Sequence, residues 1–195
     1  HQVSETLLRQ VLAAGDLRVP DVGGLLWATL PEAILTAGVV LILLLESLRV
    51  NGARLFPRIS LGIVVGLLAL TASGLGSGKA QVAGPLAVDD MARIFRLLFL
   101  SAGAYTLLFG MRRAEEWFGQ AEFHVLLLAS LAGMSVLSAS TDMLTAYLSF
   151  EMVSYTGYLM VGYRKGDRAS SEAGMKYVIF GAAASGAMLF GITLL

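Results

Sequence analysis

The chain has 195 residues, of which 56% are hydrophobic and only 14% charged, with a formal net charge of +0 and a mean hydropathy of +0.75. Because an ordinary soluble domain has about 25% charged residues, this composition is typical of a membrane protein. The neutral charge provides no basic surface for nucleic acid. The absence of cysteine excludes disulfides, thiolate zinc sites and iron–sulfur ligation within these residues.

Residues 1–25 are predicted to form an amphipathic N-terminal segment. Leu7, Leu8, Val11 and Leu12 recur at helical spacing among polar residues. This pattern is typical of a short helix that lies on the membrane surface. The segment is too polar for the apolar region of a signal peptide.

Six apolar segments follow, and most approach or exceed the about 20 residues that a helix needs to cross a bilayer. They span residues 26–48, 59–75, 94–111, 123–141, 143–163 and 172–195. The predicted fold class is therefore all-α, a polytopic transmembrane helix bundle of about six spans. Only Asp142 separates the fourth segment from the fifth, which predicts a tight helical hairpin. The sequence stops inside its last apolar run, and we expect it to be a fragment of a longer protein.

Lys and Arg alternate between the predicted loops. The loops after the first, third and fifth spans are the basic ones, with Arg49, Arg54 and Arg58, then Arg112 and Arg113, then Arg164, Lys165 and Arg168. The loop after the fourth span has no Lys or Arg, and the loop after the second has only Lys79 and Arg93. Because basic loops stay on the cytoplasmic side, the odd-numbered loops are predicted to face the cytoplasm.

The loop after the second span, residues 73–90, is rich in glycine. Its Gly74-Leu-Gly-Ser-Gly-Lys79 stretch has the wrong spacing for a phosphate-binding loop, and no strand precedes it. The Gly84-Pro85 turn instead predicts a small β-hairpin on the outer side of the membrane.

Glu151 is the main candidate functional residue. It lies near the middle of the fifth span, where a carboxylate costs about 2.5–3.5 kcal/mol on insertion scales. Tyr147, Ser154, Tyr155 and Tyr158 follow helical spacing on the same face, which gives a polar stripe typical of a bundle interior or hydrated cavity. A structural carboxyl between helices is the alternative, and the stripe favours a functional one.

Lys176, near the start of the sixth span, is the second candidate. It could take part in proton transfer on the cytoplasmic side, pointing into the bundle, at a depth about 5–10 Å from Glu151. It could equally pair with Glu172 one turn earlier, or extend toward the membrane interface. Glu32, Glu46 and His124 are predicted to be interfacial.

Four stretches of the sequence resemble one family of membrane proteins. They are Leu30-Pro-Glu-Ala-Ile-Leu35, Val88-Asp-Asp-Met-Ala-Arg-Ile-Phe95, Phe150-Glu-Met-Val-Ser-Tyr-Thr-Gly-Tyr158 and Ser171-Glu-Ala-Gly-Met-Lys-Tyr-Val-Ile-Phe-Gly-Ala182. Together they are similar to the antiporter-like membrane subunits of NADH-quinone oxidoreductase (respiratory complex I), most of all to the subunit N type. The resemblance covers about residues 26–195.

The resemblance implies a proton-translocating membrane subunit, located in a bacterial plasma membrane together with other membrane and peripheral subunits. In the family, the glutamate at the position of Glu151 pairs with a lysine on a later span, and a further lysine matches Lys176. Opening a pair of charges 4 Å apart at an effective dielectric of 20 changes their interaction by about 4 kcal/mol, enough to drive proton transfer. No cofactor is expected in this chain. NAD, FMN, iron–sulfur clusters and quinone are implied in other subunits.

Two other functions share these motifs. One is a subunit of a cation/proton antiporter that is not driven by redox chemistry. The other is a membrane subunit of a hydrogenase or a formate-oxidising complex. The proteins that accompany the chain in its native membrane would discriminate among the three.

Overall fold

The computed structural model describes residues 22–49, 55–76, 81–112, 121–164 and 166–194. Within them the chain forms six α-helices and one two-stranded antiparallel sheet. In chain order the elements are α2 (Val22–Ser47), α3 (Leu55–Ser73), β1 (Gln81–Ala83), β2 (Leu86–Val88), α4 (Asp90–Arg112), α5 (Ala121–Ala139), α6 (Met143–Val161) and α7 (Arg168–Thr193). The predicted all-α bundle of about six spans is confirmed. The predicted amphipathic segment lies, as far as residue 21, outside the described residues.

The helices are as long as a bilayer requires. Five of the six described helices, all except α6, are long and apolar enough to cross a membrane. Helix α6 has the length, 19 residues, but is less apolar because it carries Glu151, three tyrosines and several hydroxyl side chains. In hydrocarbon every backbone polar group must be paired within the protein, so such a segment still has to be helical. The start of α3 at Leu55 and of α7 at Arg168 shows that helices continue beyond the predicted apolar segments.

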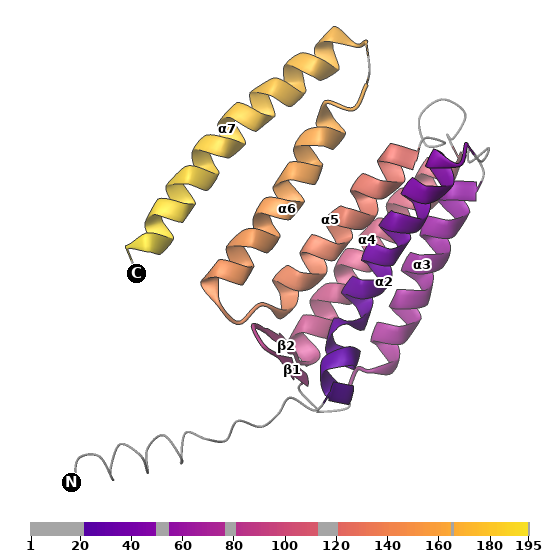
Figure 1. The fold of residues 1–195 in the computed structure, drawn as a ribbon, viewed down its shortest axis with the longest axis vertical. Helices are drawn as coiled ribbons and strands as arrows, with labels where there is room; N and C mark the ends of the chain where they lie inside the picture. The colour runs from indigo at the N-terminus through magenta and orange to yellow at the C-terminus, as the bar shows by residue number, and fades with distance from the viewer. Residues whose placement is uncertain (1–21, 50–54, 77–80, 113–120, 165, 195) are drawn as a thin grey trace, which may run out of the picture.

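Successive helices run in opposite directions through the bundle (Figure 1). The hairpin β1–β2 and the α5–α6 connection lie at one end of the bundle, called here the hairpin end. The C-terminal ends of α2, α4 and α6 lie at the other, called the basic end (Figure 1). Arg49, Arg58, Arg164 and Arg168 belong to the basic end, as the alternation of charge predicts. That this end faces the cytoplasm stays a prediction.

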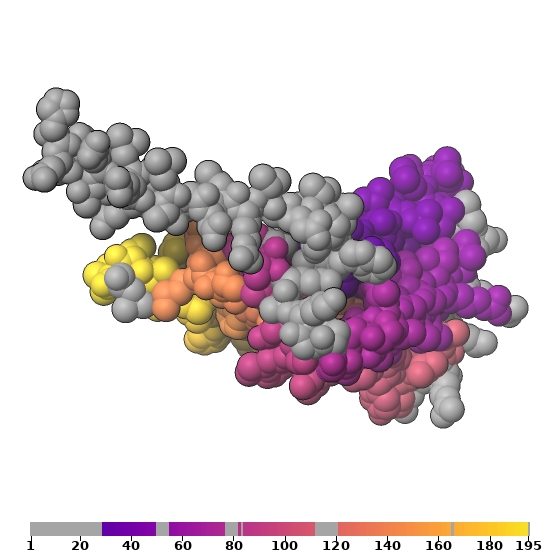
Figure 2. Space-filling model, turned by 90° about the horizontal axis from the view of Figure 1, so that it is seen from below, coloured from indigo at the N-terminus to yellow at the C-terminus, as the bar shows by residue number. Residues whose placement is uncertain are grey.

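The apolar core belongs to α2–α5. Its fully buried side chains come from all four helices and include Leu35, Ile42, Val64, Leu107 and Leu128. Helix α6 packs on α5, and α7 contacts only α6 among the described elements. Seen from the hairpin end, α7 forms one edge of the molecule (Figure 2). None of the apolar window of α7 is buried by the described residues.

The hairpin and the α5–α6 connection hold each other in place. Gly84 turns the hairpin with a φ of 59°, in the left-handed region that glycine adopts without a Cβ clash. The Thr141 backbone N–H and hydroxyl both donate to the Pro85 carbonyl, at 2.8 and 2.9 Å. Asp142 then caps α6 by accepting from the Thr145 N–H at 2.8 Å, which holds the pKa of Asp142 below its usual range. The predicted hairpin turn and tight helical connection are both confirmed.

Candidate functional site

Glu151 lies near the middle of α6 and is buried, with 8% of its surface exposed. Its Oε1 atom has no hydrogen-bond partner among the described residues. Tyr147, one turn earlier on the same face, is close enough to interact with the carboxylate electrostatically. A buried carboxylate oxygen without a partner is costly, so this position calls for a proton, a water or a cation.

The face of α6 that carries Glu151 is turned toward α7. Tyr158, seven residues further on, lies within about 20° of Glu151 around the helix because two turns take about 7.2 residues. The Tyr158 ring meets the Tyr177 ring of α7 edge-on at 4.8 Å, and its hydroxyl lies over Gly181, where a Cβ would approach it to 1.9 Å. Glu151 is therefore placed at the α6–α7 side, away from the main core.

The opposite face of α6 packs on α5. A Cβ at Gly133 would lie 2.9 Å from the Val153 side chain and 3.3 Å from the Ser149 carbonyl, so the two helices are in close contact. The predicted polar stripe is only partly enclosed by the described helices: Tyr158 is buried, whereas Tyr155 is 60% exposed. Helix α6 thus lies between the main core and the α7 side of the bundle, where Glu151 is placed.

Lys176 does not approach Glu151. Helix α7 meets α6 through Gly174, Tyr177 and Gly181, and a residue two positions after Gly174 points about 200° away from that contact. The Lys176 ammonium instead bonds Glu172 at 2.6 Å, with both side chains exposed. Gly174 lies level with Gly162, and Lys176 is two residues further along the antiparallel helix. Lys176 is therefore level with about residue 160 of α6, about 14 Å from the level of Glu151 at 1.5 Å per residue. The expected inward orientation and the expected offset of about 5–10 Å are therefore wrong for the described helices.

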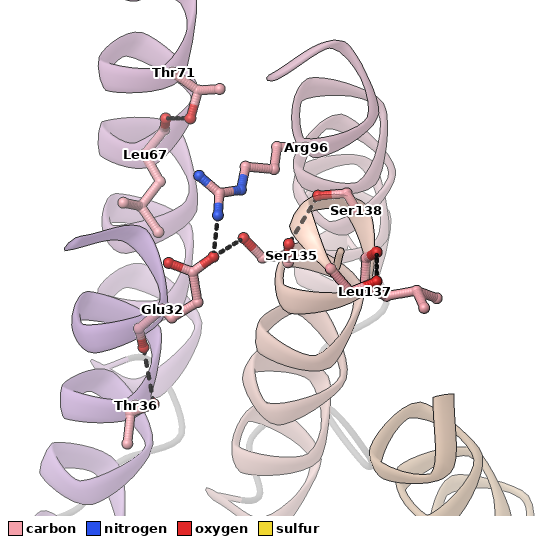
Figure 3. Close-up of polar contacts among 9 residues, drawn as sticks. Glu32, Thr36, Leu67, Thr71, Arg96, Ser135, Leu137 and Ser138 are labelled. Carbon is pink, nitrogen blue, oxygen red and sulfur yellow. Dashed lines mark hydrogen bonds and ion pairs between the residues drawn. The ribbon is translucent and has the colours of Figure 1, made fainter. Parts of the chain in front are cut away.

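A second acid, Glu32, lies between helices of the bundle, where the sequence predicted an interfacial residue. The residue is half-buried, and its Oε2 atom is buried. The Glu32 carboxylate of α2 accepts hydrogen bonds from the Arg96 guanidinium of α4 and from the Ser135 hydroxyl of α5, the latter at 2.7 Å (Figure 3). The Arg96 side chain is 3% exposed and that of Glu32 is 13% exposed. The interfacial prediction for Glu32 is wrong because α4 brings a cation to it inside the bundle.

Arg96, the cation of this ion pair, borders a hollow of about 180 Å³ toward the hairpin end, which is lined by Pro31, Thr71, Gly74, Arg93 and Arg96 together with three other residues. Arg93 forms a second ion pair with Asp90, at 2.8 Å. Arg96 could have been noticed in the sequence as a charge inside the third apolar segment. Its partner lies 64 residues away and has no local signal.

The two other predicted interfacial residues differ from each other. Glu46 is exposed near the end of α2, as expected. His124 is completely buried, so its interfacial prediction is wrong. Its ring packs edge-on against Phe123 at 5.5 Å. Helix α5 packs against α2, α4 and α6, and this packing accounts for the burial of the ring.

Comparisons with known proteins agree with the motifs. Residues 140–195 match the family described as NADH:quinone oxidoreductase/Mrp antiporter, TM. NADH-quinone oxidoreductase subunit N of Anaeromyxobacter sp. is 38% identical over 175 residues, which cover 85% of this chain and 33% of that protein. NAD(P)H-quinone oxidoreductase subunit 2 of Gloeobacter violaceus is 33% identical over 88% of this chain and 34% of its own length.

Solved structures show the same helix arrangement. A chain of respiratory complex I from Thermus thermophilus with bound aureothin matches with a TM-score of 0.71 at 29% identity, covering 84% of this chain and 36% of that one. An archaeal membrane-bound sulfane sulfur reductase matches with a TM-score of 0.75 at 20% identity, covering 86% and 36%, which shows a common fold. The chain spans about a third of the length of these relatives. By sequence and by fold, it belongs with the antiporter-like membrane subunits of NADH-quinone oxidoreductase and is most similar to subunit N.

Proposed function

We propose that the chain is part of a proton-translocating membrane subunit of an NADH-quinone oxidoreductase in a bacterial plasma membrane. The observation that carries the proposal is Glu151, a buried carboxylate at mid-membrane depth whose Oε1 has no hydrogen-bond partner among the described residues. Ionisable groups at this depth are costly and mark ion or proton pathways. The relatives named as subunits of this enzyme support the same assignment.

Glu151 would act by gaining and losing a proton as a cation approaches and leaves. Two unit charges 4 Å apart interact by about 4 kcal/mol at an effective dielectric of 20. That energy corresponds to a change of about a thousandfold in proton affinity. The family resemblance assigns the cation to a lysine on a later span. Glu151 is placed for such an exchange because its face is turned away from the α2–α5 core.

Lys176 would serve as a proton-uptake group near the basic end. Its ammonium and the Glu172 carboxylate are exposed on the face of α7 that points away from α6. Transfer from there to Glu151 has to cross about 14 Å, so it needs water or hydroxyl side chains between them. The Tyr158 hydroxyl lies between these two levels on the α6–α7 side.

The redox chemistry would belong to other subunits. NADH oxidation and quinone reduction require NAD, FMN, iron–sulfur clusters and quinone, and the sequence has no cysteine to ligate a cluster. The role of this chain in the translocase is then to convert motion or charge received from its partner subunits into proton transfer.

Glu151→Gln tests the central claim. The amide keeps the shape of the side chain but cannot carry the charge, so proton translocation in coupled vesicles should fall by about tenfold or more. Electron transfer and assembly should remain, and Glu151→Asp should be milder. Glu46→Gln, an exposed glutamate exchanged in the same way, is the matched control and should translocate protons normally. Normal translocation by Glu151→Gln would show that Glu151 is structural.

Lys176 has its own test. Lys176→Ala should slow proton uptake, and Lys176→Arg should restore part of it because the cation is kept. Glu172→Gln removes the same ion pair while keeping Lys176, so it should leave uptake almost unchanged. Equal effects of Lys176→Ala and Glu172→Gln would mean that Lys176 acts only through this ion pair.

The orientation can be measured directly because the chain has no cysteine. Cysteine at Val82, an exposed residue of the hairpin, should react with an impermeant thiol reagent from outside only. Cysteine at Ala169, at the start of α7, should react from the cytoplasmic side only. Reaction of both from the same side would overturn the topology.

A cation/proton antiporter subunit is the second candidate, because the matching family includes Mrp antiporters. A membrane subunit of another redox complex is the third candidate, because the chain shares its fold with the sulfane sulfur reductase. Mass spectrometry of the native complex separates them. Peripheral NADH-oxidising subunits are expected for the main proposal. Small membrane subunits alone would indicate the antiporter, and a nickel–iron hydrogenase or formate-oxidising subunit the third candidate.

A further inference from the structure

The hydrogen bonds of Glu32 are distributed unevenly between its two oxygens. Arg96 and Ser135 both donate to Oε1. Oε2 is buried and has no partner among the described residues. A proton could therefore be added to Oε2 directly, because neither hydrogen bond occupies that oxygen. A carboxylate held only for structure would gain more by sharing its bonds between both oxygens, as bidentate pairing with arginine does.

The charges around Glu32 balance when the carboxylate is ionised. Arg96 is its direct partner, and Arg93 is the next cation, near enough to act on Arg96 electrostatically. Asp90 neutralises Arg93 at 2.8 Å. Helix α5 contributes the Ser135 hydroxyl, and α3 contributes Thr71, whose hydroxyl donates to the Leu67 carbonyl. Protonation of Glu32 would thus leave one uncompensated positive charge, on Arg96.

The hollow beside Arg96 could hold water that solvates this positive charge. It lies beside Arg96 on the hairpin side, and its volume of about 180 Å³ exceeds the roughly 10–15 Å³ that one water needs. The Arg96 Nε, buried and without a partner among the described residues, belongs to a side chain that lines it. Water in the hollow could bond the guanidinium once Glu32 is neutral.

We propose that Glu32 and Arg96 form a second proton-exchange site in this chain, supplied with water through the hollow at the hairpin end. In the exchange, hydronium gives its proton to Oε2 and leaves as water. The Glu32 carboxylate becomes a neutral acid, and Arg96 shifts its hydrogen bonds toward the hollow. On release the acid returns the proton to water and Arg96 pairs with Oε1 again. The proposal rests on the proton-translocating function above and adds a site separated from Glu151 by α5.

The test needs a variant that removes the charges without leaving one of them buried alone. Glu32→Gln with Arg96→Gln does so, because both charges disappear together and amide groups can still bond. In coupled vesicles we expect assembly and electron transfer to persist while proton translocation falls by about tenfold or more. Arg164→Gln with Asp167→Asn is the control, since it removes an exposed ion pair outside the site, and it should change translocation less than twofold. Translocation at the normal rate in the double variant would overturn the proposal.

A measurement on the unaltered protein covers the case in which the double variant fails to assemble. Dicyclohexylcarbodiimide reacts with protonated carboxyl groups in apolar sites: the carboxyl oxygen adds to the central carbon and the proton moves to nitrogen. Peptide mass spectrometry should find Glu32 modified, increasingly as the pH is lowered. No modification of Glu32 at any pH, under conditions that modify Glu151, would show a permanently ionised structural pair.

The two proposals fail separately. If Glu151→Gln abolishes translocation and the double variant does not, only the Glu32 site is wrong. If Glu151→Gln translocates protons normally, the role proposed for Glu151 is wrong, whatever the double variant does.

Discussion

Helices α2–α5 bury a glutamate together with its cation, whereas α6 buries a glutamate whose Oε1 has no hydrogen-bond partner among the described residues. Glu32 accepts bonds from two other helices, inside a core with many fully buried side chains. Glu151 lies on the side of α6 toward α7, the helix in which no residue of the apolar window is buried by the described residues. The contrast shows two uses of a membrane carboxylate. A carboxylate paired with a cation can hold helices together, and one with no cation beside it can respond to an arriving charge.

The largest effect is expected where the paired charge is broken. Arg96→Met leaves Glu32 buried without its cation, which should destabilise the protein by about 3–5 kcal/mol. Lys176→Met, the same exchange in the exposed pair of α7, should cost about 0–1 kcal/mol. Thermal unfolding of the full-length protein in its membrane complex measures both. Equal losses of stability in the two variants would contradict the view that the Glu32–Arg96 pair is enclosed and the Glu172–Lys176 pair is not.

The next effect concerns apolar packing. Leu128 is completely buried at the centre of α2–α5, so Leu128→Ala should cost about 2–5 kcal/mol through the cavity that it creates. Phe180 of α7 is 75% exposed, and Phe180→Ala should change stability by less than about 0.5 kcal/mol in spite of its larger side chain. A large cost at Phe180 would mean that another segment or subunit covers α7 in the assembled protein.

The contact between α6 and α7 gives a smaller effect. A Cβ on Gly174 would lie 2.8 Å from the Gly162 Cα, and because the obstacle is backbone, the helices must separate. Gly174→Ala should therefore cost about 1–3 kcal/mol. Gly186→Ala is the control in the same helix, since a Cβ there meets nothing within 4 Å. It should be neutral or stabilise α7 by up to about 1 kcal/mol. Separation of α6 from α7 in the Gly174→Ala variant should also lower proton translocation if Glu151 depends on α7.

The smallest effect is expected at the cap of α6. Asp142→Ala removes the acceptor of the Thr145 N–H and should lower the Tm slightly at neutral pH. Because this bond lowers the pKa of Asp142 in the folded protein, its stabilisation is present above the unfolded pKa and is lost as the pH falls through the folded one. The two proteins should thus unfold alike once the pH lies below the lowered pKa that Asp142 has in the folded protein. A Tm difference that persists in acid would show that the carboxylate charge is not the cause.

Several features could be predicted from the sequence because local rules determine them. A bilayer leaves no water for the backbone, so apolar runs of about 20 residues become helices whatever they pack against. The turn at Gly84 and the cap at Asp142 depend on residues only a few positions apart. The position of Glu151 at the middle of its helix follows from counting residues.

The tertiary structure decided which side chains meet. Every helix in a bilayer is apolar on most sides, so the pattern that marks the inner face of a soluble helix is weak here. Glu32 and Ser135 are 103 residues apart, and only the packing of α2 against α5 makes them partners. Packing between helices also buries His124, and the contact of α7 with α6 turns Lys176 away from Glu151. The sequence by itself determined the number of helices and the apolar part of each, because solvation acts on each segment separately. Only the tertiary structure decided how the helices are rotated about their axes, because rotation depends on close packing between segments far apart in the chain.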